Sequence, residues 1–187
     1  MNKLRIALIA CAAALATLMS QTSLAYYTVT GTATNVITSG IIEMAIREKT
    51  ASGEDFPSQG VYVMPGDRVS KIVTVESLCN HPFYLRVKLV DGINDVTLSA
   101  EKVFGIEIND AYWTLKDGYY YYNDIVIPGE STQPLFSEVR IVGHEVDNRH
   151  LGKILSLTVD ASAVQVQNNP ADFPWEAAGW PQEGGNG

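Results

Sequence analysis

Hydrophobic and polar residues alternate along most of this chain, and the alternation is clearest in residues 26–34. Taken two by two, this segment places an apolar set on one side and four threonines on the other. Such a period is typical of a β-strand with one buried face. We predict an N-terminal strand over residues 26–35 whose apolar side consists of Tyr27, Val29, Gly31 and Ala33, after the leading Tyr26.

The same period recurs downstream and predicts further strands over 42–47, 69–76, 83–90, 103–108, 112–115, 119–122, 135–142 and 153–167. Turn signals at short spacing separate about eight to ten such strands, which is the pattern of an antiparallel sandwich. After the N-terminal leader, the sequence shows the period of no long amphipathic helix, so we expect only a few short helical turns, such as one over 98–102. The predicted fold is all-β, an antiparallel, jelly-roll-like β-sandwich over residues 36–167.

Turn chemistry supports these strand boundaries. Met64-Pro65-Gly66-Asp67 has proline and glycine at the central positions of a type II turn, and Pro128-Gly129-Glu130 repeats that chemistry. Lys116-Asp117-Gly118 is a hairpin signal between two predicted strands. Residues 51–60 are polar and contain two glycines and a proline, so we predict an exposed loop there.

The first residues have the features of an export signal. Lys3 and Arg5 give a positive start, residues 6–19 are apolar, and Ser23-Leu24-Ala25 supplies the small residues of a cleavage site. We predict a signal peptide over 1–25. Its apolar run is too short for a stable membrane span.

Cleavage between Ala25 and Tyr26 would free the predicted N-terminal strand, whose unpaired backbone groups then need a sheet to complete. The alternative is a lipoprotein box that ends at Cys11, but the apolar run continues past that cysteine. We therefore prefer ordinary cleavage before Tyr26.

Charge and cysteine content narrow the function. Loss of Lys3 and Arg5 with the leader changes the formal charge from −8 to −10, and an acidic surface does not suit nucleic acid, so we predict no such partner. Of the two cysteines, Cys11 leaves with the leader, which excludes an internal disulfide. We interpret Cys79 as a small core residue at a strand end rather than a nucleophile.

The segment from His144 to His150 is the nearest approach to a metal site. A zinc-protease helix needs two histidines four residues apart, whereas these are six apart. That spacing turns the rings apart on a helix and separates them by about 20 Å on a strand. A solvated turn is the preferred interpretation and an irregular metal-binding loop is the alternative, while His81 has no ligand spacing.

Two further motifs are explained by structure rather than chemistry. Asp91-Gly92-Ile93-Asn94-Asp95 is rich in oxygen ligands but lacks the spacing of an EF-hand, so a turn explains it better than calcium. Tyr119 to Tyr122 lie on a predicted strand, so two rings should face the core and two the surface. We predict no catalytic residue, no cofactor and no metal.

The tail over residues 168–187 differs from the rest of the chain. Its prolines and glycines prevent a regular element. Its aromatic residues either dock on the body or belong to a disordered segment. Those residues are Phe173, Trp175 and Trp180.

Several short motifs occur in a suggestive order: Ala25-Tyr26-Tyr27-Thr28, Thr32-Ala33-Thr34-Asn35, Thr38-Ser39-Gly40-Ile41-Ile42, Met64-Pro65-Gly66-Asp67, Tyr84-Leu85-Arg86-Val87-Lys88, the hairpin of residues 113–122, Pro128-Gly129-Glu130 and Ala163-Val164-Gln165. In this order, over most of the mature chain, they resemble the TasA and camelysin family of secreted bacterial proteins. The resemblance implies a jelly-roll subunit exported by a Gram-positive-type cell, with a leader cut by a SipW-type signal peptidase. It also implies that the N-terminal strand of one subunit completes the sheet of the next, as in the fibre-forming relatives.

Our prediction is a secreted structural subunit of biofilm-matrix or cell-surface fibres, located in the extracellular matrix or at the cell wall surface. It would form a head-to-tail homopolymer by strand addition, with a minor matrix protein or a polysaccharide as a further partner. Three alternatives stay open. The leading strand could pair with an edge of its own domain, the protein could be a metallo-endopeptidase as camelysin-like relatives are described, or it could be a monomeric surface adaptor.

Overall fold

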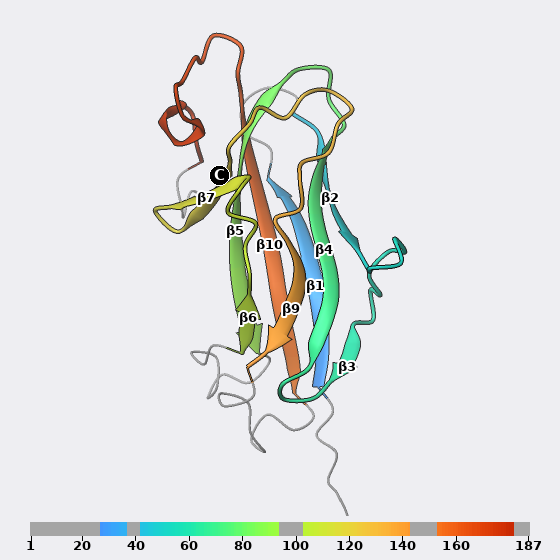
Figure 1. Ribbon diagram of the computed structural model, residues 1–187. Helices are drawn as coiled ribbons and strands as arrows, with labels where there is room; N and C mark the ends of the chain where they lie inside the picture. The colour runs from blue at the N-terminus through green and yellow to red at the C-terminus, as the bar shows by residue number, and fades with distance from the viewer. Residues whose placement is uncertain (1–26, 37–41, 94–102, 143–152, 182–187) are drawn as a thin grey trace, which may run out of the picture.

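The computed structural model describes residues 42–93, 103–142 and 153–181 in full, and residues 27–36 by their backbone. Figure 1 shows an elongated body whose strands run along its length. The signal peptide predicted over 1–25, the helical turn predicted over 98–102 and the histidine motif over 144–150 lie outside the described residues.

Ten strands and one 3₁₀ turn form the regular structure of these ranges. Their bounds are β1 (Tyr27–Val36), β2 (Met44–Lys49), β3 (Val61–Val63), β4 (Arg68–Ser77), β5 (Phe83–Ile93), β6 (Phe104–Ile106), β7 (Trp113–Lys116), β8 (Tyr119–Tyr122), β9 (Phe136–Ile141), β10 (Ile154–Gln165) and η2 (Pro174–Glu176).

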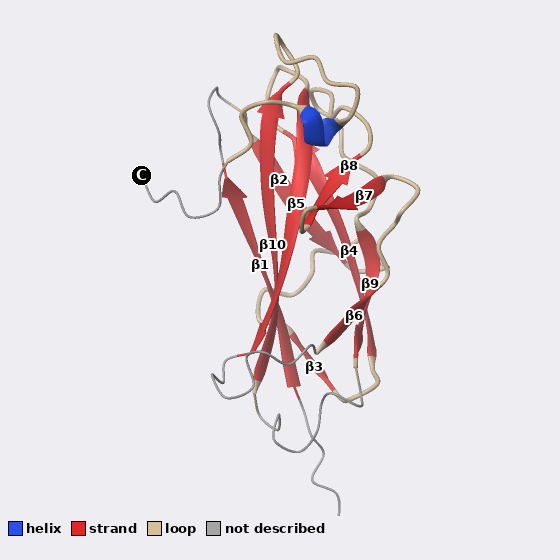
Figure 2. Ribbon diagram, turned by 90° about the vertical axis from the view of Figure 1, so that its left-hand side faces the viewer, coloured by secondary structure: helices blue, strands red, loops and turns tan. Residues whose placement is uncertain are grey.

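The strands form two sheets that face each other, as Figure 2 shows. The larger has six strands in the order β3-β1-β10-β5-β8-β7, and the smaller has four in the order β2-β4-β9-β6. All pairs between these strands are antiparallel except β1 with β10, which is parallel. The predicted all-β sandwich is confirmed, while its jelly-roll topology stays a prediction.

Alternating side chains of both sheets fill the space between them. On β10, Leu155, Leu157 and Val159 are at most 1 % exposed, whereas the residues between them are half-buried. Full burial of such a side chain stabilises the fold by about 1.5–3 kcal/mol. The inward side chains of β10 therefore form a central part of the core on the side of the larger sheet.

The alternation of the sequence located most strands closely. The segment predicted over 69–76 is β4, the segment over 83–90 is most of β5, and the segment over 119–122 is β8. The sequence did not predict β3, because three residues are too few to show a period. The loop predicted over 51–60 is exposed apart from Phe56 and the half-buried Gly60.

The predicted turns are confirmed. Gly66 has a φ of +90°, and the N–H of Asp67 donates to the carbonyl of Met64 at 3.0 Å, as in a type II turn. Asp117 and Gly118 both have positive φ, 51° and 81°, which is the conformation of a type I′ hairpin between β7 and β8.

One ion pair lies inside the smaller sheet. The side chain of Lys71 is fully buried, and its Nζ lies 2.9 Å from Oε1 of Glu48 on β2 and 4.9 Å from the ring centroid of Phe56. The two charged atoms are close, but neither has a hydrogen bond of good geometry within the described ranges. Desolvation offsets most of the attraction in such a pair, so it is weak evidence for stability.

A search of the described residues for a helix that could cross a membrane finds none.

Candidate functional site

The N-terminal strand occupies a slot inside the larger sheet, between β3 and β10 (Figure 1). It pairs in parallel with β10 from Thr28 beside Ile154 to Val36 beside Ser162, and it pairs antiparallel with β3 along its other edge. β1 is therefore an interior strand of the sheet, although it is the first strand in the described part of the chain.

The register aligns the predicted apolar set of β1 with the buried row of β10. The partners of Val29, Gly31 and Ala33 are three side chains that are at most 1 % exposed, namely Leu155, Leu157 and Val159. Apolar residues at these positions suit a strand that borders a dry interior.

Along the edge toward β3, the apolar residues of β1 also have apolar partners. Tyr27 is the partner of Val63, which is 2 % exposed, and Val29 is the partner of Val61. Four of the five residues predicted for the assembly strand are thus placed in the ladder, and Tyr26 lies outside the described residues.

In this single chain β1 pairs with strands of its own domain, as the alternative predicted, and it lies there as an interior strand between β3 and β10. Among the described strands, β3 pairs with β1 alone, and β10 meets β5 on its far side. Withdrawal of β1 would expose the backbone groups of β10 and leave β3 without a ladder. The slot requires a strand, and the ladder does not specify which copy of the chain supplies it.

The C-terminal tail also lies against the larger sheet, on its outer face. Asn169 closes this tail into a loop, because its amide accepts from the N–H of Ala178 and donates to the carbonyl of the same residue, both at 2.9 Å. Ala177 is buried against Tyr84 and Val164. Docking on the body is therefore the correct alternative for the described part of the tail.

Arg86 of β5 is the centre of this contact, which we name the Arg86 clasp. Its guanidinium donates to the carbonyl of Pro181 and, at 3.4 Å, to the hydroxyl of Tyr121. The guanidinium carbon lies 3.8 Å from the ring centroid of Tyr119 and 4.8 Å from that of Trp180, so the cation stands between two aromatic faces. Its Nε is buried without a partner within the ranges described.

The tyrosines of β8 divide as predicted. Tyr120 and Tyr122 pack with the core, while Tyr119 and Tyr121 lie on the outer side with Arg86. Tyr121 is nevertheless buried, because aromatic rings of the tail cover it. The sequence missed this second layer, since the tail showed no pattern that named its docking surface.

The aromatic rings that an adaptor would offer are mostly engaged within the chain. Trp175 and Trp180 lie edge-on to Tyr121, with ring centroids at 6.1 and 5.5 Å. Phe173 stacks on Trp175 at 4.7 Å and is 50 % exposed, so it is the tail ring that the solvent reaches most.

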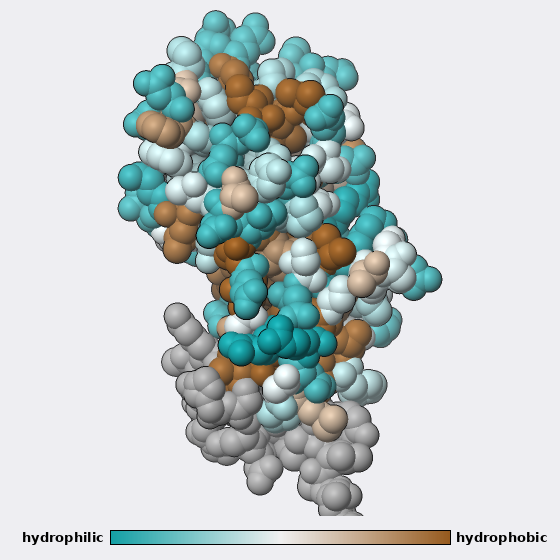
Figure 3. Space-filling view, viewed as in Figure 1, coloured by the Kyte–Doolittle hydropathy of each residue, from teal (hydrophilic) through white to brown (hydrophobic). Residues whose placement is uncertain are grey.

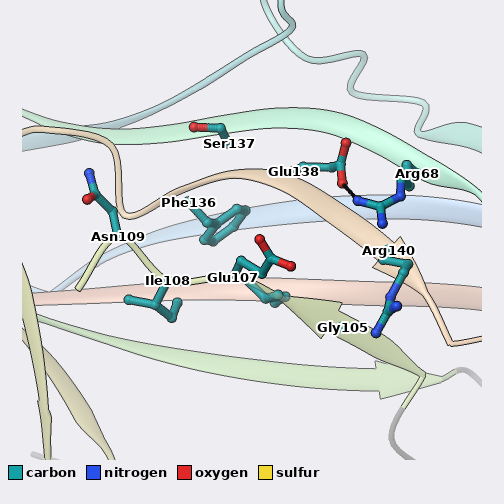
Figure 4. Close-up of a pocket in the computed structure, with 10 residues that line it drawn as sticks. Arg68, Gly105, Glu107, Ile108, Asn109, Phe136, Ser137, Glu138 and Arg140 are labelled. Carbon is teal, nitrogen blue, oxygen red and sulfur yellow. Dashed lines mark hydrogen bonds and ion pairs between the residues drawn. The ribbon is translucent and has the colours of Figure 1, made fainter. Parts of the chain in front are cut away.

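An open pocket of about 430 Å³ lies where β6 stops pairing with β9 (Figure 4). Arg68 and Glu138 form an ion pair in it, and the guanidinium of Arg140 lies beside Gly105. The paired side chains are 58 % and 46 % exposed, so the pocket lacks the desolvation that tunes reactive groups. It supplies a surface of balanced charge.

The predicted core role of Cys79 agrees with its position. The residue is 8 % exposed two positions after the end of β4, and its thiol lies 3.1 Å from the carbonyl oxygen of His81. Within the described ranges, no three His, Cys, Asp or Glu side chains are grouped so that they could hold a metal ion.

Comparison of the chain with protein-family models, with curated proteins and with solved structures gives no match.

Proposed function

We propose that this chain is an exported structural subunit of extracellular fibres, in a biofilm matrix or at the cell wall surface, and that its subunits are joined by exchange of β1. The β1 strand of one subunit would fill the slot between β3 and β10 of the next. One observation carries the proposal: the first described strand, β1, is an interior strand, in the parallel ladder of an otherwise antiparallel sheet. A terminal strand can leave and enter a sheet without threading a loop.

The energetics permit exchange but do not drive it. The closed and exchanged forms contain the same ladder, so exchange of an identical element costs little in contacts. The covalent tether favours the closed form with an effective concentration in about the millimolar range, which dense secretion or additional contacts between subunits can offset. Donation to one neighbour and acceptance from another is a heterologous contact, so it propagates.

Export cleavage provides the natural start of assembly. Before cleavage the strand continues into the leader, whereas cleavage between Ala25 and Tyr26 by a SipW-type peptidase leaves it as a free end. The resemblance to the TasA and camelysin family supports the same order of events. A minor matrix protein or a polysaccharide would be a further partner of the fibre.

The proposal is tested with the mature protein that starts at Tyr26, by sedimentation velocity and electron microscopy over a concentration series. We expect fibres from the wild type and none from Val29→Asp, because its partner Leu155 belongs to the buried row and a carboxylate there is costly. The matched variant Thr30→Asp, whose partner Ser156 is half-buried, should still assemble. Wild-type protein that stays monomeric at roughly 1 mM would contradict the proposal.

A further inference from the structure

A fibre made by strand exchange needs a contact that the closed monomer lacks. The β1 ladder is the same in both forms, so the ladder by itself does not favour assembly. The tether, in contrast, favours the closed monomer. This inference rests on the proposed function: if β1 is exchanged, some surface between subunits must supply the difference.

The connector between β1 and β2 limits where that surface lies. Residues 37–41 join Val36 to Ile42 through six Cα-to-Cα steps, which span at most about 20 Å. If β1 keeps its register in a neighbour's slot, its last residue lies within that distance of Ile42 in its own body. Ile42 is 1 % exposed and is therefore fixed in the core.

β1 ends and β2 begins at the same end of the sandwich, the upper end in Figure 1. The connector therefore brings the upper end of the donor close to the upper end of the acceptor. A neighbour that receives the strand cannot be stacked a full molecular length away. Consecutive subunits must meet through this end.

An exposed apolar patch lies at the same end. Leu78, Ile125 and Ile127 are 50 %, 42 % and 45 % exposed, and we name them the end patch. Figure 3 shows hydrophobic surface gathered at the upper end of the molecule, over the loops that follow β4 and precede β9. Neighbouring exposed apolar side chains of this size mark interaction surfaces more often than singly scattered ones do.

Backbone hydrogen bonds tie the end patch to the start of β2. The N–H of Leu78 donates to the carbonyl of Glu43 at 2.9 Å, one residue from Ile42. The turn that contains Ile127 is joined to the end of β4, because the N–H of Ser77 donates to the carbonyl of Glu130 at 2.8 Å. The patch is thus part of the rigid body and lies beside the point where the connector enters it.

We propose that the end patch is the surface through which a second copy of this chain contacts the first, and that this contact turns strand exchange into assembly. The occupant is the upper end of the neighbouring subunit, because the connector holds that end within reach. The end patch meets a different side of that end, so the contact is heterologous and propagates with the donated strand. Burial of the three side chains against the neighbour supplies the apolar free energy that the ladder cannot.

Acidic residues lie around the end patch and should make assembly depend on salt. Glu43, Asp124 and Glu130 are exposed at this end, so two copies that meet here bring carboxylates of like charge together. Salt screens that repulsion and leaves apolar contact intact. Assembly should therefore become easier from low salt to roughly 0.5 M salt.

The test compares variants of the mature, full chain by the concentration at which half of the protein sediments as assemblies. The double variant Leu78→Glu/Ile127→Glu should raise that concentration about tenfold or more, since it replaces apolar contact with further like charge. The matched control is Leu115→Glu, which adds a charge at an apolar residue 60 % exposed on β7 and should change little. Far-ultraviolet circular dichroism checks that each variant is folded.

Unchanged assembly of the double variant, or an equal loss in the Leu115→Glu control, would overturn the role of the end patch. The outcome for strand exchange is read separately from Val29→Asp. Loss of fibres in Val29→Asp together with normal fibres in the double variant overturns the end patch and leaves strand exchange standing. Normal fibres in Val29→Asp overturn the exchange and, with it, the role assigned to the patch.

Discussion

The first and the last segments that the structure describes are both attached to the larger sheet, but by different means. β1 lies inside the sheet and is held by backbone ladders to β3 and β10. The C-terminal tail lies on the outer face and is held by particular side chains, chiefly Arg86, Tyr121 and Asn169. A ladder accepts any strand of suitable direction and alternation, whereas the clasp needs matched side chains. The first kind of attachment is the one that the proposed strand exchange uses, because β1 of another copy offers the same backbone groups.

Chain connectivity reinforces this difference. The tail follows β10 directly and docks on β5, which is next to β10 in the same sheet, and on β8, which is next to β5. Its contacts are therefore formed locally once the sheet exists. β1 meets β10 only after the whole body has been synthesised, so another copy can compete for the slot during folding.

The largest effect should come from the inner row that borders the slot. Leu157→Ala removes a side chain that is 1 % exposed between the sheets, and we expect a loss of about 3 kcal/mol in the free energy of unfolding. Denaturant titration of the mature protein measures it. The neighbouring Thr158→Ala, at a half-buried outer position, is the control and should stay within about 0.5 kcal/mol. Equal losses at the two positions would show that the inner row does not hold the slot.

Removal of the Arg86 clasp should have the next largest effect, and it should be local. Arg86→Ala loses the hydrogen bond to Pro181 and the stacking on Trp180, partly offset by relief of a buried charge, so we expect the tail to detach at a cost of about 1–2 kcal/mol. Limited proteolysis followed by mass spectrometry locates the cut. Arg86→Lys keeps the charge without the planar fork and should be intermediate.

A tail that stays protected from protease in Arg86→Ala would contradict the clasp. Fibre formation gives a second test. If the tail plays no part in assembly, the concentration at which fibres form should be the same for Arg86→Ala and wild type. A shift as large as that expected for the end patch would mean that the two ends of the chain are coupled.

Loss of the hydrogen bonds that close the tail loop should have a smaller effect on stability. Asn169→Ala removes both hydrogen bonds to Ala178 and should cost about 1 kcal/mol. Amide hydrogen exchange at Ala178 is the measurement, since its N–H loses its acceptor. Asn169→Asp retains an acceptor for that N–H and should keep most of the protection. Protection of Ala178 that does not change in Asn169→Ala would show that the loop is held from elsewhere.

The smallest effect should come from a surface ion pair that belongs to neither attachment. Arg47 and Glu76 lie 2.6 Å apart on β2 and β4, with side chains 48 % and 31 % exposed. Arg47→Ala should change the free energy of unfolding by at most about 0.5 kcal/mol, because solvent and salt screen such pairs. Thermal unfolding at low and high salt measures it. A loss of unfolding free energy comparable to that of Leu157→Ala would contradict the predicted order of effects.

The sequence predicted the strands because alternation is local information. It placed β4, β5 and β8 and predicted a strand at the position of β1, since alternation marks a strand wherever one face is buried. It could not name the partner strand of Val29, because an alternating strand needs an apolar surface but does not specify one. The parallel ladder with β10 therefore came only from the structure.

The Arg86 clasp could not be predicted from the sequence for the same physical reason. Alternation assigns Arg86 to the outer face of β5, where an arginine is ordinarily solvated. Its burial depends on the carbonyl of Pro181, which is 95 residues away in the chain. The local pattern around either residue does not indicate that contact. The end patch was missed because exposed isoleucines in a loop look the same as core residues in a sequence.

The most direct test of strand exchange mixes two singly substituted mature chains, one with Thr30→Cys and the other with Ser156→Cys, both with Cys79→Ala. Thr30 and Ser156 are partners in the ladder between β1 and β10. A disulfide between the two kinds of chain can therefore form at this register only if β1 of one lies in the slot of the other. After co-assembly and mild oxidation, the account predicts covalent heterodimers that accumulate with the fibres. Fibres that form from the mixture without that cross-link would contradict it.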